Sequence, residues 1–92
     1  MNRETLNEYS KLYDLFEENT EYTIKDVGNK YMSETSCMIE GNTNDNKTYQ
    51  VMYMSGYTNI KVYDEEYSEY GNDDEKIIFD EEYETPNLIR LN

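Results

Sequence analysis

The sequence predicts an α+β fold, in which an N-terminal amphipathic helix packs on an antiparallel sheet of four or five strands. Two observations favour this fold class. Apolar residues recur at helical spacing over residues 3–18, whereas several later segments alternate apolar and polar residues, as half-buried strands do. Polar or glycine-containing turns separate those later segments. A chain of 92 residues has the length of one domain, which we expect to span residues 1–92.

The expected helix covers residues 3–18. Its apolar positions follow one another at spacings of three and four residues, which places them on one face of a helix. They are Leu6, Tyr9, Leu12, Tyr13 and Phe16. At the other end, Glu17 and Glu18 fall in the last turn, where the helix dipole disfavours anions. We therefore expect these two acids either to join an acidic face or to be ordinary surface residues.

The expected sheet begins after Asn19-Thr20. Residues 22–27 alternate loosely and lead to Gly28-Asn29, which has the composition of a two-residue hairpin turn. The strongest alternation follows the polar loop 41–47, and Ser55-Gly56 is the next expected turn. The expected strands are 22–27, 31–40, 48–54, 58–63 and 76–79, with 88–91 as a candidate last edge strand after Pro86.

Two local structures are open for the segment that follows Tyr63. Tyr63, Tyr67 and Tyr70 have helical spacing, so 64–70 can form a short helix that Asp64 caps and Gly71 ends. An extended chain would instead separate alternate carboxylates by roughly 6.6 Å. Both structures expose the acids, but only the helix turns the tyrosines toward the sheet.

One internal repeat links the two most acidic stretches. Residues 60–67, IKVYDEEY, match residues 76–83, KIIFDEEY, at an offset of sixteen. Each copy reads as a short apolar strand that hands over to Asp-Glu-Glu-Tyr. One pair of copies is too few for a solenoid, and a chain rich in Glu and Tyr can produce the match by chance.

Charge is distributed unevenly along the chain. The formal net charge is −13, of which residues 1–63 contribute −4, residues 64–84 contribute −10 and residues 85–92 contribute +1. We call residues 64–84 the acidic segment; Lys76 is its one cation. Such a surface repels nucleic acids and anionic membranes and attracts basic surfaces. Direct binding of nucleic acid or of a membrane is therefore not expected.

The residue types speak against an enzyme. The chain has no histidine, so neither a Ser–His nor a Cys–His nucleophile pair can form, and Cys37 is expected to be a small buried residue. No cofactor is expected. The clustered acids also lack the ligand spacing of a Ca²⁺-binding EF-hand loop: with Gly71 at the sixth position, Ile77 occupies the twelfth, which requires Glu. We expect no dedicated metal site.

A binding surface for a basic protein remains. Carboxylates can present to a groove lined with Arg and Lys a field comparable to that of a nucleic acid, and tyrosine rings can stack on guanidinium groups. The alternative is that the charge run serves only to solvate the surface. The candidate partner-binding residues are Asp64, Glu65, Glu66, Tyr67, Glu69, Tyr70, Asp73, Asp74, Glu75, Asp80, Glu81, Glu82, Tyr83 and Glu84.

In size, single-domain organisation and its acidic runs 64–66, 73–75 and 80–84, the chain resembles the small acidic inhibitors that bacteriophages make against host defence nucleases, including anti-CRISPR and anti-restriction proteins. The resemblance covers charge pattern and architecture over the C-terminal third and includes no motif that can be aligned. It implies inhibition by DNA mimicry, in which the chain occupies a groove such as the one where a Cas effector reads DNA.

Two other functions are open. A bacterial toxin-immunity protein would neutralise a basic nuclease with the same surface physics, and a Ca²⁺-binding or structural phage protein would use the acids differently. A single cysteine permits no internal disulfide, and the N-terminus has no apolar run of the signal-peptide type. We therefore expect the protein in the cytoplasm of a bacterial host. The composition does not predict an oligomeric state.

Overall fold

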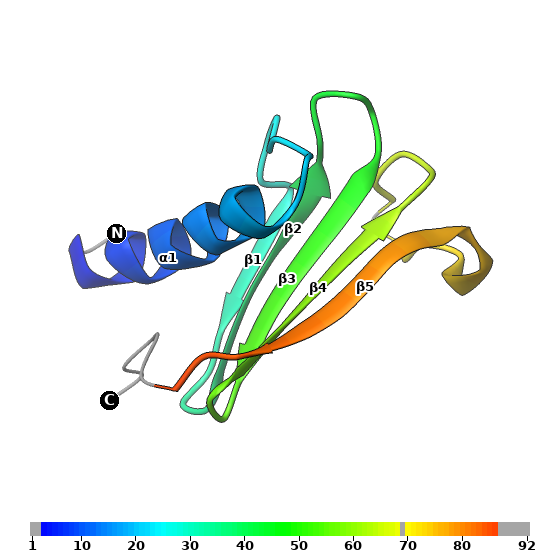
Figure 1. Ribbon diagram of the computed structural model, residues 1–92. Coiled ribbons are helices and arrows are strands. Elements are labelled where there is room, and N and C mark those ends of the chain that lie inside the picture. Colours follow the sequence, from blue (N-terminus) through cyan, green and yellow to red (C-terminus); the bar gives the residue numbers. More distant parts are fainter. Residues whose placement is uncertain (1–2, 69, 87–92) are drawn as a thin grey trace.

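The computed structural model describes residues 3–68 and 70–86, with side chains from residue 9 onward. Within these residues there is one α-helix and one five-stranded sheet (Figure 1), so the predicted α+β fold is confirmed. The elements are α1 (Arg3–Asn19), β1 (Asn29–Met32), β2 (Ser36–Asn42), β3 (Thr48–Met54), β4 (Tyr57–Tyr63), a short 3-10 helix η1 (Asp74–Lys76) and β5 (Ile77–Glu84).

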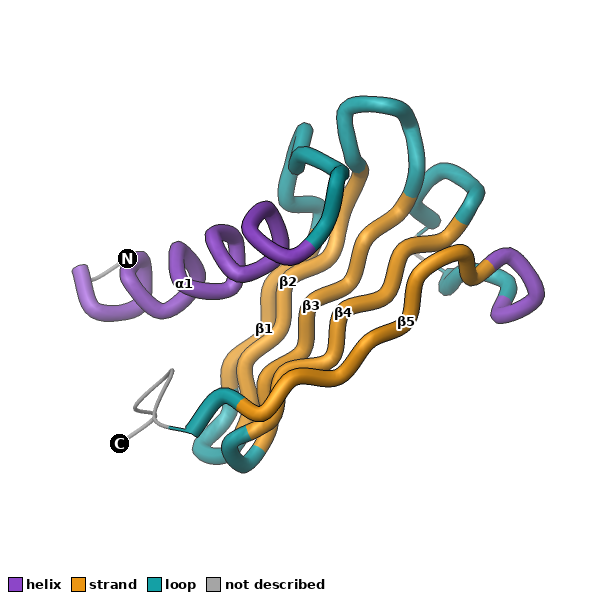
Figure 2. Tube along the Cα trace, in the orientation of Figure 1, coloured by secondary structure: helices purple, strands orange, loops and turns teal. Residues whose placement is uncertain are grey.

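The sheet is an antiparallel meander. Its spatial order is β1-β2-β3-β4-β5, so each strand pairs with the one before it in the chain (Figure 2). The helix packs against β2 and β3, and β5 forms the sheet edge farthest from it along the strand order (Figure 1). The helix therefore covers only part of one face of the sheet.

The core lies between α1 and the face of the sheet that it covers. Leu12 and Phe16 of the predicted apolar stripe are fully buried, and Tyr9, Tyr13 and Leu15 pack around them. The Phe16 ring lies 5.2 Å from the Tyr49 ring, centroid to centroid, with the planes tilted by 46°. Tyr49 is fully buried, and its hydroxyl donates to the Asp26 carbonyl over 2.9 Å. The covered face of the strands contributes Cys37, Ile39, Tyr49, Val51, Tyr53, Thr58, Ile60 and Val62.

The other face of the sheet, which we call the open face, carries the alternate residues. Among the described residues, no helix packs on it. The strand register places its side chains in rows across the sheet, because partners that lie opposite each other point to the same side. One row is Tyr31, Met38, Met52, Asn59 and Glu82, and the next is Asn29, Glu40, Gln50, Lys61 and Asp80.

The expected strand 22–27 is wrong. Only Ile24 makes a bridge there, with Thr43, and the amides of Lys25 and Asp26 both donate to the Asn42 carbonyl. The segment passes too close to β2 for a regular ladder: a Cβ built at Gly41 would lie 2.4 Å from the Asp26 carbonyl oxygen. Glycine at position 41 is what allows this close crossing.

The first hairpin turn lies elsewhere than the sequence suggests. The expected strand 31–40 is two strands, β1 and β2, which turn at Ser33–Ser36, while Gly28-Asn29 leads into β1. The Ser33 hydroxyl accepts hydrogen bonds from the amides of Thr35 and Ser36, and the Ser33 amide donates to the Ser36 carbonyl over 2.9 Å. This serine-based turn reverses the chain, which the sequence led us to expect at Gly28-Asn29.

The last described strand is longer than expected. β5 runs to Glu84 and so includes most of the second acidic stretch, where only 76–79 was expected. Asp and Glu have low intrinsic strand propensity. The backbone hydrogen bonds to β4 therefore hold these residues in the strand. β3 covers its expected range, 48–54, and β4 begins at Tyr57, one residue before its expected start. The candidate strand 88–91 lies outside the described residues.

Candidate functional site

The acidic segment occupies one side of the molecule. It comprises the loop that leaves β4, the 3-10 helix η1 and the edge strand β5 (Figure 1). We call the loop, residues 64–76, the acidic loop, and this loop together with β5 the acidic edge. Glu69 lies outside the described residues. Of the ten other acids of the segment nine are exposed, and Glu65 is half-buried.

The acidic loop is neither the short helix nor the extended strand that the sequence allows. Its backbone groups bond instead to side chains of the sheet: the Thr48 hydroxyl donates to the Glu65 carbonyl over 2.8 Å, and the Tyr67 amide donates to the Asn42 side chain over 2.8 Å. The side-chain nitrogen of Asn72 lies 3.0 Å from both the Thr48 hydroxyl and the Glu66 carbonyl. Uncharged groups thus hold the loop in place, and these bonds neutralise none of its carboxylates.

Two carboxylates of the loop accept hydrogen bonds from its own backbone amides. The amide of Asp73 donates to Glu65 over 2.5 Å, and the Asp73 carboxylate accepts the amide of Glu75 over 2.9 Å, which caps η1. The side chains of Asp74 and Glu75 are exposed. Glu65 and Asp73 therefore help to shape the loop, and Asp74 and Glu75 present their charge to solvent.

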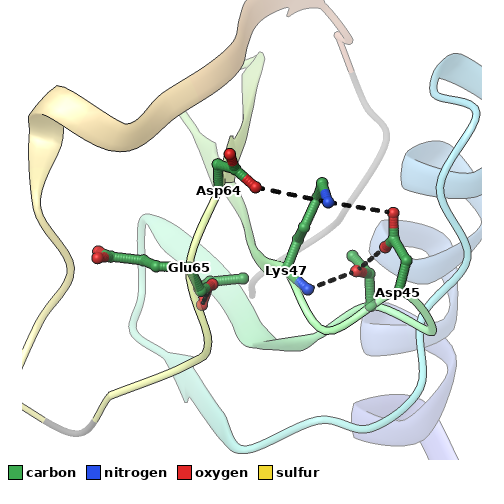
Figure 3. A network of polar contacts seen from close by, with 6 residues as sticks. Asp45, Lys47, Asp64 and Glu65 are labelled. Atoms are coloured by element: carbon green, nitrogen blue, oxygen red, sulfur yellow. Dashed lines mark hydrogen bonds and ion pairs between the residues drawn. The ribbon is translucent and has the colours of Figure 1, made fainter.

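One lysine reaches this region from outside the segment. Lys47 lies between Asp45 and Asp64, with its ammonium nitrogen 3.5 Å from a carboxylate oxygen of each, while the Glu65 side chain points away (Figure 3). Burial lowers the pKa of Lys47, but the attraction of Asp45 and Asp64 outweighs it and leaves the pKa raised. Among the described residues, Asp64 is the one acid of the segment in an ion pair.

β5 divides its acids between the two faces of the sheet. Asp80 and Glu82 lie opposite Lys61 and Asn59 on the open face, and Glu84 lies opposite Tyr57 on the same face. Glu81 lies opposite the buried Ile60 and so belongs to the covered face, although its own side chain is exposed. The second Asp-Glu-Glu-Tyr stretch, residues 80–83, is thus part of a strand whose side chains alternate between the two faces of the sheet. Three of the four acids of β5 lie on the open face.

The spacing of these three acids limits how literally they can imitate DNA. Alternate residues of a strand are roughly 6.6 Å apart, whereas one DNA strand carries a charge about every 3.4 Å along the helix axis. The spacing of the carboxylates therefore corresponds to about every second phosphate of a DNA strand. The surface is negatively charged like a nucleic acid, but its charges are farther apart. This spacing is suited to attracting cations and not to imitating each phosphate in turn.

The three candidate tyrosines have different surroundings. Tyr67 packs against Gly28, where a Cβ built on the glycine would lie 3.1 Å from the Tyr67 ring. Tyr83 is half-buried at the core margin; burial and then the charge of Glu81 raise the pKa of its hydroxyl. Tyr70 is fully exposed. Tyr67 and Tyr83 thus contribute to packing, and Tyr70 alone of the three presents a whole ring to solvent.

Tyr63, which is not one of the candidate partner-binding residues, lies within the field of the acids. Tyr63 is buried at the end of β4, where the chain enters the acidic loop. Burial raises the pKa of its hydroxyl, and the charges of Asp74 and Asp80 raise it further. In the sequence Tyr63 is the last residue of the expected strand 58–63, and only the fold brings acids from the loop and from β5 near it.

A separate cavity of about 350 Å³ lies at the opposite edge of the sheet, between α1 and β1. The Lys30 ammonium lies 5.5 Å from the centroid of the Tyr9 ring there. The volume of this cavity is near the lower end of the range for small-molecule pockets. Its lining residues are Tyr9, Ser10, Tyr13, Asp14, Val27, Lys30 and Ile39.

The described residues form neither a cluster suited to a metal ion nor a helix suited to crossing a membrane. In the described part of the chain, no three residues of the types Asp, Glu, Cys and His are arranged to hold a metal ion. No helix within the described residues has the length and the apolar character needed to cross a membrane. Cys37 is a buried cysteine of the core.

Comparison with known proteins gives no relative: no family model, curated protein or solved structure matches the chain.

Proposed function

We propose that this protein is an inhibitor that binds a basic nucleic-acid-binding protein, such as a bacterial CRISPR-Cas effector or another defence nuclease, through its acidic edge. The observation that carries the proposal is the concentration of nine exposed carboxylates on the loop and the edge strand, of which Asp64 alone lies in an ion pair among the described residues. Concentrated like charge costs stability, so its presence supports a role outside the fold.

The proposed action is occupation of a groove. Arg and Lys side chains that bind the DNA backbone would face carboxylates instead, and the long-range field would speed the encounter. A preorganised loop lowers the entropy lost on binding, because its conformation is already held by Thr48, Asn42 and Asn72. DNA and the inhibitor could not then bind together.

The test compares two variants of equal net charge. In the first, Asp80→Asn, Glu82→Gln and Glu84→Gln neutralise the open-face acids of β5; in the matched control, Asp14→Asn, Glu18→Gln and Glu34→Gln neutralise three exposed acids elsewhere. Each protein is immobilised, exposed to a bacterial lysate and washed with duplex DNA, and the released proteins are identified.

We expect the natural chain and the control to retain a basic nucleic-acid-binding protein that DNA releases, and the β5 variant to retain much less of it. The proposal is wrong if all three retain the same proteins in equal amounts, or if the retained protein keeps DNA and the inhibitor bound at once.

A further inference from the structure

The open face of the sheet carries a group of partly exposed apolar side chains beside the acidic edge. Met54 and Tyr57 lie opposite each other on β3 and β4, and the side chain of each residue is about half exposed. Tyr31 on β1 lies opposite Met38, which in turn lies opposite Met52. We call Tyr31, Met38, Met52, Met54 and Tyr57 the Met/Tyr patch.

This composition is typical of a contact surface. Met and Tyr are enriched at protein interfaces, Tyr because it gives a large contact area at low entropic cost and Met because its flexible side chain adapts to a partner. A purely solvated sheet face would carry polar residues at these positions. On the covered face, the corresponding central residues are buried under α1.

Charges next to the patch indicate what kind of partner fits it. The open face carries Glu40, Asp80, Glu82 and Glu84 against one cation, Lys61, which gives −3. Neighbouring strands are about 4.8 Å apart, so Met52 lies about 9.6 Å from the β5 backbone, two strands away. An Arg or Lys side chain that lies over the patch can therefore direct its charge to the carboxylates of β5.

We propose that the open face is the docking surface for the basic partner, with the Met/Tyr patch as its apolar centre and Asp80, Glu82 and Glu84 as its charged rim. This inference rests on the proposed function and adds to it that the partner must combine cations with apolar side chains. A second copy of the chain is disfavoured as the occupant, because it would bring another −3 against the same charge.

The test uses two synthetic ten-residue peptides of equal charge, one alternating Arg and Leu and the other alternating Arg and Gly. Each is titrated into the full chain labelled at its methionine methyl groups, and binding is followed by NMR. The variant Tyr31→Ser, Met54→Ser, Tyr57→Ser alters three exposed side chains of the patch, and the β5 variant described above alters its rim.

We expect the Arg-Leu peptide to bind about tenfold more tightly than the Arg-Gly peptide, to shift the methyl signals of Met38, Met52 and Met54, and to lose this advantage with the patch variant. The β5 variant should weaken both peptides. Equal binding of the two peptides with unchanged methyl signals would overturn the inference and leave charge attraction, and thus the proposed function, intact.

Two other outcomes also decide the question. If neither peptide binds, the acidic edge does not attract cations as supposed, and the proposed function falls with the inference. If the methyl signals instead change with protein concentration in the absence of peptide, and sedimentation shows a dimer, a second copy occupies the face and the inference is wrong.

Discussion

Asn59 on β4 donates a hydrogen bond from its side-chain amide to a carboxylate oxygen of Asp80 on β5, over 3.0 Å. The same nitrogen lies 3.2 Å from the Glu81 carbonyl. An uncharged side chain thus fixes the orientation of an edge-strand acid without neutralising it. Uncharged side chains also hold the acidic loop, where Thr48, Asn42 and Asn72 bond to its backbone and to one another rather than to its carboxylates.

Neutralising the open-face acids of β5 should stabilise the fold. In the variant Asp80→Asn, Glu82→Gln, Glu84→Gln, three like charges at alternate positions of one strand disappear, and the repulsion among them disappears too. We expect Tm at low salt to rise by a few degrees, more than in the control Asp14→Asn, Glu18→Gln, Glu34→Gln. Thermal unfolding followed by circular dichroism measures the difference. A fall in Tm would mean that these acids are structural.

Asp73, which caps η1, should differ in its effect on stability from Asp74 and Glu75, which lie inside η1. Asp73→Ala removes the cap that accepts the Glu75 amide, and we expect a loss of about 1 kcal/mol in the free energy of unfolding. Asp74→Asn with Glu75→Gln should leave this free energy unchanged or slightly raise it, because both side chains are exposed. Urea denaturation distinguishes the two. Equal losses in both variants would contradict the assignment.

Tyr67 and Tyr70 should respond differently to truncation. Tyr67→Ala removes a ring that packs on Gly28, and we expect a loss of about 1–3 kcal/mol, below the cost for a fully buried aromatic residue. Tyr70→Ala should change the free energy of unfolding by less than about 0.5 kcal/mol, because the residue is fully exposed. Denaturant unfolding of both variants checks this. A destabilising Tyr70→Ala change would show that its ring packs in solution.

The stability contributed by Asp45 should depend on pH with a defined sign. A hydrogen bond from the Thr43 hydroxyl, with a further contribution from Lys47, lowers the pKa of Asp45. A carboxylate whose pKa is lower in the folded than in the unfolded chain stabilises above its unfolded pKa, about 3.9, and loses that contribution as pH falls through the folded pKa. Asp45→Asn should therefore destabilise the protein at pH 7 and have little effect near pH 2. A difference that stayed constant across this range would exclude the linkage.

The sequence predicts the fold class because its strongest signals are local. The stripe that contains Leu12 and Phe16 specifies the helix, and the alternation over Thr48–Met54 specifies the central strand. The first hairpin was misplaced because Gly28 suggests a turn, whereas the glycine serves close packing against Tyr67. A tertiary contact, which no local pattern reveals, decided that position.

The candidate site could be predicted in composition but not in geometry. The acids were found from charge alone, yet their faces depend on β5 extending to Glu84 and on its pairing with β4. A period-two signal was present in Ile77, Phe79 and Tyr83, although the acidic residues between them hid it. The residues of the open face could not be predicted, because they depend on the strand register and on which face the helix covers.

The central claim is that the acidic edge attracts a cationic protein surface. It is tested most directly by the affinity of the natural chain for the protein retained from the lysate, measured by calorimetry at about 50 mM and about 500 mM salt. We predict at least a tenfold weaker affinity at the higher salt, and a smaller change for the variant Asp80→Asn, Glu82→Gln, Glu84→Gln. An affinity that is the same at both salt concentrations would contradict the claim.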